Sequence, residues 1–365
     1  QQISCEASMN KDLEILRFQI NEIDNKIIEL LEKRSEIVKK IGTIKREKGL
    51  SFYAPERENQ IYKTLDSLKL SFMNKNSLKA IFREIMSASI KMEEPLTISY
   101  LGPEATFTHQ AAIEKFGTSL YYQPEESIED VFFDVEQDRA DFGVVPIENS
   151  IEGVVNYTLD MFVNSNVKIV SEIMVDIKHN LLSKSTSLSE IKAVYSHPNA
   201  LGQCKNWLKK HLPNAILLET ASTAKAAKIA AKDKSAAAIS SLAASSLYDL
   251  NVLAKGIEDK INNVTRFLVI GKHIPSPSGE DKTSLMFSIH DKVGALYSIL
   301  KIFYDNQINL TRIESRPSKQ ENWSYIFYVD VDGHIESESV KKAFDGLSEI
   351  VPFVKLLGSY PKYIK

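Results

Sequence analysis

Residues 11–48 constrain the fold most, because this segment contains no proline and a single glycine, Gly42. Its apolar residues recur three and four positions apart, which is the spacing of one face of an α-helix. They are Leu13, Leu16, Ile20, Ile23, Ile27, Leu30, Ile37, Ile41 and Ile44. At about 1.5 Å per residue the helix would be roughly 57 Å long, whereas a compact domain of about 90 residues is only about 30 Å across. We therefore expect a partner chain to cover the apolar face.

One cation, Arg34, occupies a position on this apolar face, and Arg17 and Lys45 flank it. A second helix is expected to begin near Pro55, and a third is expected over residues 77–93. A helical site with several cations, one or two carboxylates and a hydroxyl suits a small dianion whose rearrangement needs positioning and electrostatics rather than a nucleophile. Arginine suits carboxylates because its planar guanidinium binds them through two hydrogen bonds. The alternative is a charged coiled coil from whose seam Arg34 extends to water.

Several phrases of residues 11–95 point to one kind of helical enzyme. They are Leu16-Arg17, Asp24, Lys33-Arg34, Lys45, Pro55-Glu56-Arg57-Glu58 and Ser89-Ile90-Lys91-Met92-Glu93. Through these phrases the region resembles the all-helical chorismate mutases. The resemblance implies that Arg34, Lys45 and Glu93 are catalytic. Arg34 would contact a substrate carboxylate, and Lys45 and Glu93 would face the breaking ether oxygen.

The same resemblance implies further substrate-binding residues: Arg17, Arg57, Glu58 and Ser89. Arg17 would reach the substrate carboxylate in the partner's site, and Arg57 would contact a carboxylate in its own. Glu58 would hold the substrate hydroxyl. The chain departs from the family at Ala54, where several members carry an aspartate, so any contact of that side chain is absent.

Pro95 closes the helical region, and short apolar strands then alternate with helices. We expect residues 96–271 to form a two-lobed α/β domain, like a periplasmic binding protein, with a long strand over residues 167–177 that crosses between the lobes. A cleft would lie between them. Helices that start near Thr106, Ser150 and Ser222 could present N–H groups and hydroxyls to carboxylates in this cleft. The alternative is that these hydroxyls serve only as helix caps, which the sequence favours for Ser222 and leaves open for Thr106 and Ser150.

Five phrases of this domain are specific in combination. They are Gly102-Pro103-Glu104-Ala105-Thr106-Phe107, Pro146-Ile147-Glu148-Asn149-Ser150, Ser196-His197-Pro198-Asn199-Ala200-Leu201, Ser222-Thr223-Ala224, and Asn263 with Thr265-Arg266-Phe267. Through them residues 97–271 resemble prephenate dehydratases. The resemblance implies loss of carbon dioxide and hydroxide from prephenate to give phenylpyruvate, without metal or cofactor.

The dehydratase resemblance also implies roles for single residues. Thr265 would be catalytic beside the leaving hydroxyl, and Arg266 would anchor a carboxylate. Glu148 or a bound water could supply the proton. The implied substrate-binding residues are Thr106, Glu148, Asn149, Ser150, Ser222, Thr223, Arg266 and Phe267.

Residues 272–281 are rich in proline, serine and glycine, which indicates a linker. Residues 282–365 follow the order βαββαβ of a ferredoxin-like α+β fold. Two phrases, Asp291-Lys292-Val293-Gly294-Ala295-Leu296 and Glu314-Ser315-Arg316-Pro317, make this region similar to ACT-type regulatory domains. The resemblance implies allosteric inhibition by L-phenylalanine bound at Gly294, Ala295, Leu296, Glu314, Ser315 and Arg316. Alone, Gly294 could merely permit a tight turn.

The composition argues against several kinds of partner. A net charge of -3 with mixed signs gives no reason to expect nucleic acid or a membrane surface, and no apolar run approaches the roughly 18 residues of a membrane span. Cys5 and Cys204 are too few and too far apart for a disulfide framework or a metal site, which fits a reducing cytoplasm. Residues 1–10 lack the features of a signal peptide, and we expect them to be a disordered leader.

Together the resemblances imply a multidomain enzyme of phenylalanine biosynthesis that needs no cofactor, and the low cysteine content favours a cytoplasmic location. The enzyme would convert chorismate to prephenate and prephenate to phenylpyruvate, be inhibited by L-phenylalanine, and form a homodimer or higher homo-oligomer. The alternative is a non-enzymatic, amino-acid-sensing two-lobed binding protein, because such clefts also serve binding proteins and transcription regulators. The missing signal peptide and basic recognition helix disfavour that alternative.

Overall fold

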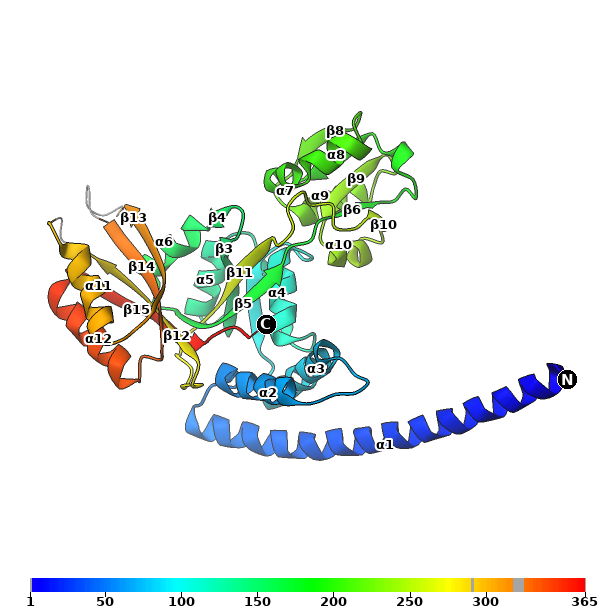
Figure 1. The fold of residues 1–365 in the computed structure, drawn as a ribbon, viewed down its shortest axis with the longest axis horizontal. Helices are drawn as coiled ribbons and strands as arrows, with labels where there is room; N and C mark the ends of the chain where they lie inside the picture. The colour runs from blue at the N-terminus through cyan, green and yellow to red at the C-terminus, as the bar shows by residue number, and fades with distance from the viewer. Residues whose placement is uncertain (1, 290–291, 318–324, 365) are drawn as a thin grey trace.

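The computed structural model describes residues 2–289, 292–317 and 325–364, which form a helical domain, a two-lobed domain and a C-terminal domain (Figure 1). The helical domain comprises α1 (Gln2–Lys48), α2 (Pro55–Ser67) and α3 (Lys75–Glu93). Helix α1 begins nine residues earlier than predicted and runs through the segment expected to be a disordered leader. No proline or glycine occurs in residues 1–10 to end the helix there.

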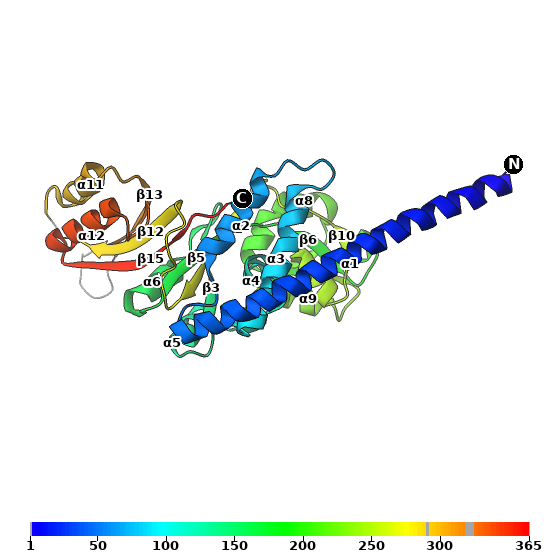
Figure 2. The ribbon, with the colours of Figure 1, turned by 90° about the horizontal axis from the view of Figure 1, so that it is seen from below.

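Helix α1 passes beneath α2 and α3, and its N-terminal part extends well beyond them (Figures 1 and 2). Its close approach to α3 depends on Gly42, where a Cβ atom would lie 3.1 Å from the Cα atom of Glu93. Much of the predicted apolar face is exposed in the single chain: Leu16 is 57%, Ile23 51% and Leu30 65% exposed. An apolar surface of this extent is typical of a face that another protein surface covers.

The first lobe of the middle domain carries a twisted sheet with helices on its faces. Its elements are β1 (Thr97–Leu101), α4 (Phe107–Phe116), β2 (Tyr121–Glu125), α5 (Ile128–Glu136), β3 (Phe142–Asn149), β4 (Gly153–Val154), α6 (Asn156–Asn164), β5 (Lys168–Asp176) and β11 (Val264–Gly271). Strands β5 and β11 pair side by side and extend toward the second lobe, so the chain enters that lobe after β5 and returns through β11 (Figure 1). The predicted crossover strand over residues 167–177 is confirmed.

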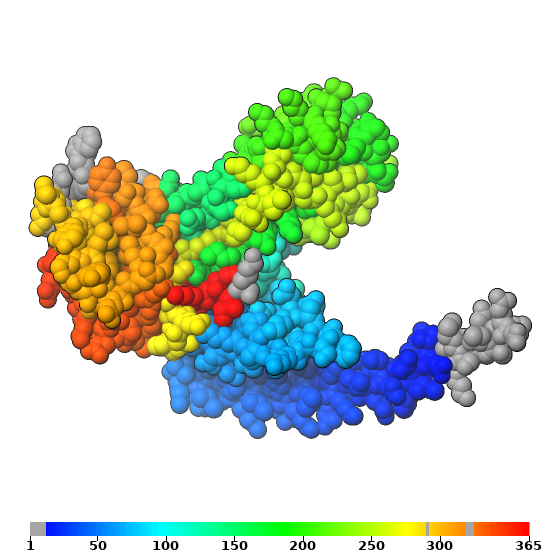
Figure 3. Space-filling view, in the orientation of Figure 1, coloured from blue at the N-terminus to red at the C-terminus, as the bar shows by residue number. Residues whose placement is uncertain are grey.

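The second lobe has its own five-stranded sheet, in the order β10-β6-β9-β7-β8. Its elements are β6 (Asn180–Ser183), a 3₁₀ turn (Leu188–Glu190), β7 (Ala193–Ser196), α7 (Pro198–Gln203), α8 (Lys205–His211), β8 (Ile216–Glu219), α9 (Thr223–Ala230), β9 (Ala236–Ser240), α10 (Leu242–Leu247) and β10 (Asn251–Ala254). The space-filling view shows this lobe joined to the first lobe, with an open hollow between it and the helical domain (Figure 3).

The C-terminal domain has the predicted βαββαβ order. Its elements are β12 (Asp281–Ser288), α11 (Ala295–Asp305), β13 (Leu310–Pro317), β14 (Tyr325–Asp332), α12 (Glu338–Ile350) and β15 (Phe353–Pro361). The predicted start of the third strand near Trp323 lies outside the described residues. Strand β15 meets β5 at Gly358 and Ile169, so one sheet runs through this domain and the first lobe. Only glycine permits this approach, because a Cβ atom at Gly358 would lie 2.2 Å from the carbonyl oxygen of Ile169.

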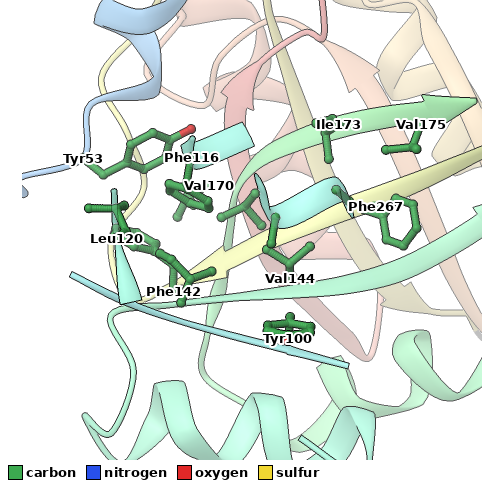
Figure 4. Close-up of a cluster of buried hydrophobic side chains, with 14 of the residues drawn as sticks. Tyr53, Tyr100, Phe116, Leu120, Phe142, Val144, Val170, Ile173, Val175 and Phe267 are labelled. Atoms are coloured by element: carbon green, nitrogen blue, oxygen red, sulfur yellow. The ribbon is translucent and has the colours of Figure 1, made fainter. Parts of the chain in front are cut away.

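The helical domain packs on the first lobe through an aromatic cluster. Tyr53, in the loop between α1 and α2, lies with its ring centroid 4.8 Å from that of Phe116 and 5.2 Å from that of Phe142 (Figure 4). All three rings belong to the buried core of the first lobe.

Among the described residues no helix is long and apolar enough to cross a membrane.

Candidate functional sites

A cavity of about 460 Å³ lies among α1, α2 and α3, against the end of α4. Six of the residues implied by the sequence line it: Arg34, Lys45, Arg57, Glu58, Ser89 and Glu93. Helical spacing accounts for two pairs, because Ser89 and Glu93 are four positions apart on α3 and Arg34 and Lys45 are eleven positions, about three turns, apart on α1, so each pair shares one face of its helix. The three helices thus bring together residues that are up to 59 positions apart in the sequence.

The polar groups of this cavity already contact one another. An Nη1 hydrogen of Arg34 is donated to Ser89 Oγ, and Lys45 Nζ donates to Glu93 Oε2 at 2.6 Å and to the carbonyl oxygen of Phe52 at 3.0 Å. Burial lowers the pKa of the Arg34 guanidinium, an effect that Glu93 opposes and Arg57 reinforces. Arginine nevertheless stays charged at neutral pH, so the cavity offers a fixed cation.

Two positions of the helical domain, Arg17 and Ala54, contribute no polar group to this cavity. Arg17 is exposed and does not line the cavity of its own chain. It precedes Arg34 by 17 positions on α1, roughly 25 Å along the axis. Ala54 does line the cavity, so the missing aspartate leaves a methyl group in its wall.

Glu58 is held by two donors from outside its own helix. The Tyr53 hydroxyl donates to Glu58 Oε2 at 2.9 Å, and Lys115 Nζ lies 2.9 Å from the same oxygen. Lys115 belongs to α4 of the two-lobed domain and was not predicted. Its sequence neighbourhood carries no signal for this contact, because only the packing of two domains brings it to the cavity.

A second, larger cavity of about 1170 Å³ lies between the two lobes. It is lined by six residues that the sequence implied: Thr106, Asn149, Ser222, Thr223, Thr265 and Phe267. Thr106 and Ser222 cap α4 and α9, where their hydroxyls accept from the backbone N–H groups of His109 and Lys225. The positive ends of both helices therefore border the cleft.

A chain of hydrogen bonds runs along the cleft from Thr265. Asn149 Nδ2 donates to Thr265 Oγ1 at 2.8 Å and to Asn263 Oδ1 at 2.7 Å, and Asn263 Nδ2 donates to Gln203 Oε1 at 2.8 Å. The Thr265 hydroxyl thus accepts from Asn149, which leaves its own hydrogen available for a ligand. The same Gln203 oxygen lies 2.8 Å from Nε2 of His179.

Gln203 and His179 were not predicted as site residues, although both line the cleft. Gln203 ends α7, close behind the Ser-His-Pro phrase, and this position is the only signal that could have found it. His179 is 3% exposed, and burial lowers its pKa. Because its Nε2 faces an amide oxygen, that nitrogen carries a hydrogen and donates it to Gln203.

Arg266 corrects a prediction, because it does not line the cleft. Side chains alternate between the two faces of a strand, so Thr265 on β11 faces the cleft and Arg266 faces away. Its Nε lies 2.8 Å from Glu172 Oε2, and its Nη1 lies 2.7 Å from Asp330 Oδ2 of the C-terminal domain. Tyr360 OH accepts from its Nη2 at 3.0 Å. Arg266 is therefore occupied in a buried domain contact and is not placed to anchor a substrate carboxylate.

Glu148 and Ser150 also lie outside the cleft lining, contrary to the prediction. Glu148 sits opposite Arg266 on the neighbouring strand and forms an ion pair with Arg312 of β13 at 3.3 Å, so it is not placed to supply a proton in the cleft. Ser150 starts no helix. Its hydroxyl accepts from Val264 N at 3.0 Å and donates to the carbonyl oxygen of Asn262 at 3.2 Å, which fixes the start of β11.

The residues expected at the regulatory site lie on two elements. Gly294 caps α11 with a φ of +81°, a left-handed conformation that favours glycine, and Ala295 and Leu296 follow in the first turn. Burial alternates along β13, where Glu314 is half-buried and Ser315 is exposed. Arg316 forms an ion pair with Asp160 of α6 at 3.2 Å, so this side chain contacts the two-lobed domain.

Family models match three consecutive parts of the chain. Chorismate mutase type II matches residues 16–94, prephenate dehydratase matches residues 98–275, and the ACT domain matches residues 283–349. The predicted combination of a helical domain, a two-lobed α/β domain and a ferredoxin-like α+β domain is confirmed.

Relatives named as bifunctional enzymes cover nearly the whole chain. A bifunctional chorismate mutase/prephenate dehydratase of Aquifex aeolicus is 49% identical over 356 residues, which are 96% of this chain and 98% of that protein. One from Pseudomonas aeruginosa is 39% identical over 358 residues, again 96% and 98%. The crystal structure of prephenate dehydratase in complex with L-Phe from Arthrobacter aurescens is 36% identical, with a TM-score of 0.68 over 73% of this chain and 90% of that one. These relatives favour an enzyme over a non-enzymatic sensor.

Proposed function

The chain belongs to the family of bifunctional chorismate mutase/prephenate dehydratases, an isomerase and a lyase on one polypeptide, and we propose that each reaction uses its own cavity. The helical cavity would convert chorismate to prephenate, and the cleft would convert prephenate to phenylpyruvate. The observation that carries this assignment is that the two cavities share no lining residue among the described parts of the chain.

In the helical cavity, the charges match a dianionic substrate. Arg34 and Arg57 would bind its carboxylates, and Glu58 would accept from its hydroxyl. Lys45 has three N–H groups, of which Glu93 and the Phe52 carbonyl oxygen use two. The third would donate to the ether oxygen as negative charge develops there, which lowers the barrier without any covalent intermediate.

The mutase site would be completed by a second copy of the chain. The exposed apolar face of α1 supports this, since burying such a face against an equivalent helix would stabilise both chains. Arg17 is too far from its own cavity along α1, whereas an antiparallel partner helix would bring the partner's Arg17 to it. We infer a homodimer with two shared mutase sites.

Mixed dimers test this sharing. Arg17→Ala and Arg34→Ala chains should each lack mutase activity, but a heterodimer combines intact residues at one of its two sites. Random mixing of equal amounts should therefore recover about a quarter of the wild-type mutase activity, because half of the dimers carry one intact site. No recovery, although subunit exchange is shown with differently tagged chains, would mean that Arg17 does not act across the interface.

In the cleft, Thr265 would contact the hydroxyl that leaves the ring. The bond to the ring carboxylate breaks as carbon dioxide departs, its electron pair completes the aromatic ring, and the hydroxide takes up a proton and leaves as water. With Arg266 turned away, the carboxylates need other partners. Lys225 and Lys228 of α9 line the cleft, beside the N–H groups at the starts of α4 and α9. These groups are placed to bind the carboxylates once the lobes close.

The C-terminal domain would regulate the dehydratase by binding L-phenylalanine. The Arthrobacter aurescens relative was solved in complex with L-Phe, which supports this ligand. Gly294 at the start of α11 borders open space, because a Cβ atom built there would have no heavy atom within 4 Å, and a ligand could therefore approach the backbone closely there. Phenylalanine inhibits only if it binds better to a less active arrangement of the lobes.

A further inference from the structure

Lys115 comes from the dehydratase domain but lines the mutase cavity. It is the last cation of α4, next to Phe116, and both residues border the cavity between α1, α2 and α3. Its ion pair with Glu58 is shielded from water, since the side chains are 14% and 11% exposed. Screening is weak at such a site, so this contact is stronger than an ordinary surface ion pair.

The contact fixes one oxygen of Glu58 and leaves the other available. Tyr53 OH and Lys115 Nζ are both 2.9 Å from Oε2. Within the described residues Oε1 makes no hydrogen bond or ion pair. A carboxylate oxygen has two acceptor positions, so Oε1 can accept from a substrate hydroxyl while Oε2 stays held.

Tyr53 and Lys115 form a rigid support for this carboxylate. The Tyr53 ring is buried in the core of the first lobe, beside Phe116 and Phe142 (Figure 4). Burial and then the charge of Glu58 raise the pKa of the Tyr53 hydroxyl, so it remains a donor at any physiological pH. Lys115 passes over the same ring, with its Nζ 5.9 Å from the centroid.

We propose that Lys115 is a positioning residue of the chorismate mutase reaction, so that the dehydratase domain completes the mutase site. Glutamate has three rotatable side-chain bonds, and fixing it before substrate arrives removes an entropic cost from the reaction. Lys115 supplies that restraint through Oε2, and Oε1 then meets the substrate hydroxyl. The inference rests on the proposed role of Glu58.

A neighbouring contact provides a matched control, because it joins the same domains without touching Glu58. The backbone N–H and the hydroxyl of Thr118, just after α4, both donate to Glu84 of α3, at 2.9 and 2.7 Å. Thr118→Val keeps the shape of the side chain and removes the hydroxyl bond. If Lys115 only docks the two domains, this variant and Lys115→Met should have similar effects.

The experiment measures both activities of full-length variants. Lys115→Met should lower the mutase kcat about tenfold, which corresponds to one charge-assisted hydrogen bond, with a smaller change in the chorismate KM. Its dehydratase activity on supplied prephenate should stay at the wild-type level, which also shows that the chain is folded. Lys115→Arg should restore most of the mutase activity, and Thr118→Val should keep it.

A double-mutant comparison separates this inference from the role of Glu58. In a Glu58→Gln background, Lys115→Met should have no further effect, because Lys115 acts through that carboxylate. An equal further loss in that background, an unchanged kcat in Lys115→Met, or an equal loss in Thr118→Val would each overturn the proposal. If Glu58→Gln itself retains full mutase activity, the assigned role of Glu58 is wrong. If Glu58→Gln loses mutase activity while Lys115→Met keeps it, the role of Glu58 stands and only the role proposed for Lys115 is wrong.

Discussion

Arg266→Met should destabilise the protein and leave prephenate binding nearly intact. Arg266 lies between two buried carboxylates, Glu172 of β5 and Asp330 of β14, and joins the dehydratase domain to the C-terminal domain. Burial alone would raise the pKa of both carboxylates, but the neighbouring cations, Arg266 first, lower it. Their stabilising effect is thus present at neutral pH and is lost as the pH falls through the depressed folded-state pKa.

The size of the effect follows from the groups that remain. Removing one partner of a buried ion pair costs about 3–5 kcal/mol, because the other charge stays buried without compensation. Lys282 Nζ still lies 2.9 Å from Glu172, and Ser284 Oγ still donates to Asp330 at 2.6 Å. We therefore expect a loss near the lower limit, about 3 kcal/mol, which lowers the thermal midpoint by about 6–12 °C.

Thermal unfolding and dehydratase kinetics of the same variant distinguish a domain contact of Arg266 from a role in binding the substrate carboxylate. The prephenate KM of Arg266→Met should stay within about threefold of wild type, since the side chain faces away from the cleft. Asp330→Asn is the control: its effect and that of Arg266→Met should be less than additive in the double variant, because they share one contact. A large rise in KM with an unchanged thermal midpoint would refute the assignment and restore Arg266 as a carboxylate ligand.

Three further predictions concern the cleft and the regulatory domain. Lys225→Met should raise the prephenate KM about tenfold with kcat nearly unchanged, and an unchanged KM would exclude it as a carboxylate ligand. Gly294→Val replaces a residue with a φ of +81°, so calorimetry should show weakened phenylalanine binding while basal dehydratase turnover persists; normal inhibition would place the ligand elsewhere. Burial lowers the pKa of His179, so as the pH falls below about 6.5 this histidine is protonated in the unfolded chain before it is protonated in the folded one. The free energy of unfolding should then decrease by up to about 1.4 kcal/mol for each unit by which the pH falls. Urea unfolding between about pH 7 and about pH 5.5 should show a flatter slope in His179→Gln, and the same slope as wild type would exclude this histidine as its source.

Patterns that depend on local periodicity were predictable from the sequence. The three helices of the mutase domain and the βαββαβ order follow from apolar spacing, and the residues of the helical cavity meet because each lies on the inner face of its helix. The start of α1 was misplaced, since the predicted leader lacks apolar periodicity but also lacks any residue that ends a helix.

The period of two along a strand predicts that Thr265 and Arg266 lie on opposite faces, but the sequence does not say which of the two faces is turned toward the cleft. Thr265, Arg266 and Phe267 are adjacent in the sequence and were assigned to one site, yet the period of two places Arg266 on the opposite face. A buried arginine at the start of a strand suits a substrate anion and a domain contact equally well. Lys115 escaped prediction for a related reason: its partner Glu58 is 57 positions earlier and in another domain.

The claim that the two reactions occupy separate sites is tested most directly by assaying Arg34→Ala and Thr265→Val with both substrates. Arg34→Ala should lose chorismate consumption but convert supplied prephenate to phenylpyruvate at the wild-type rate. Thr265→Val should consume chorismate normally and release prephenate into solution, because its hydroxyl lies only in the cleft. A mixture of the two variants should then form phenylpyruvate from chorismate. Comparable loss of both activities in either folded variant would contradict the account.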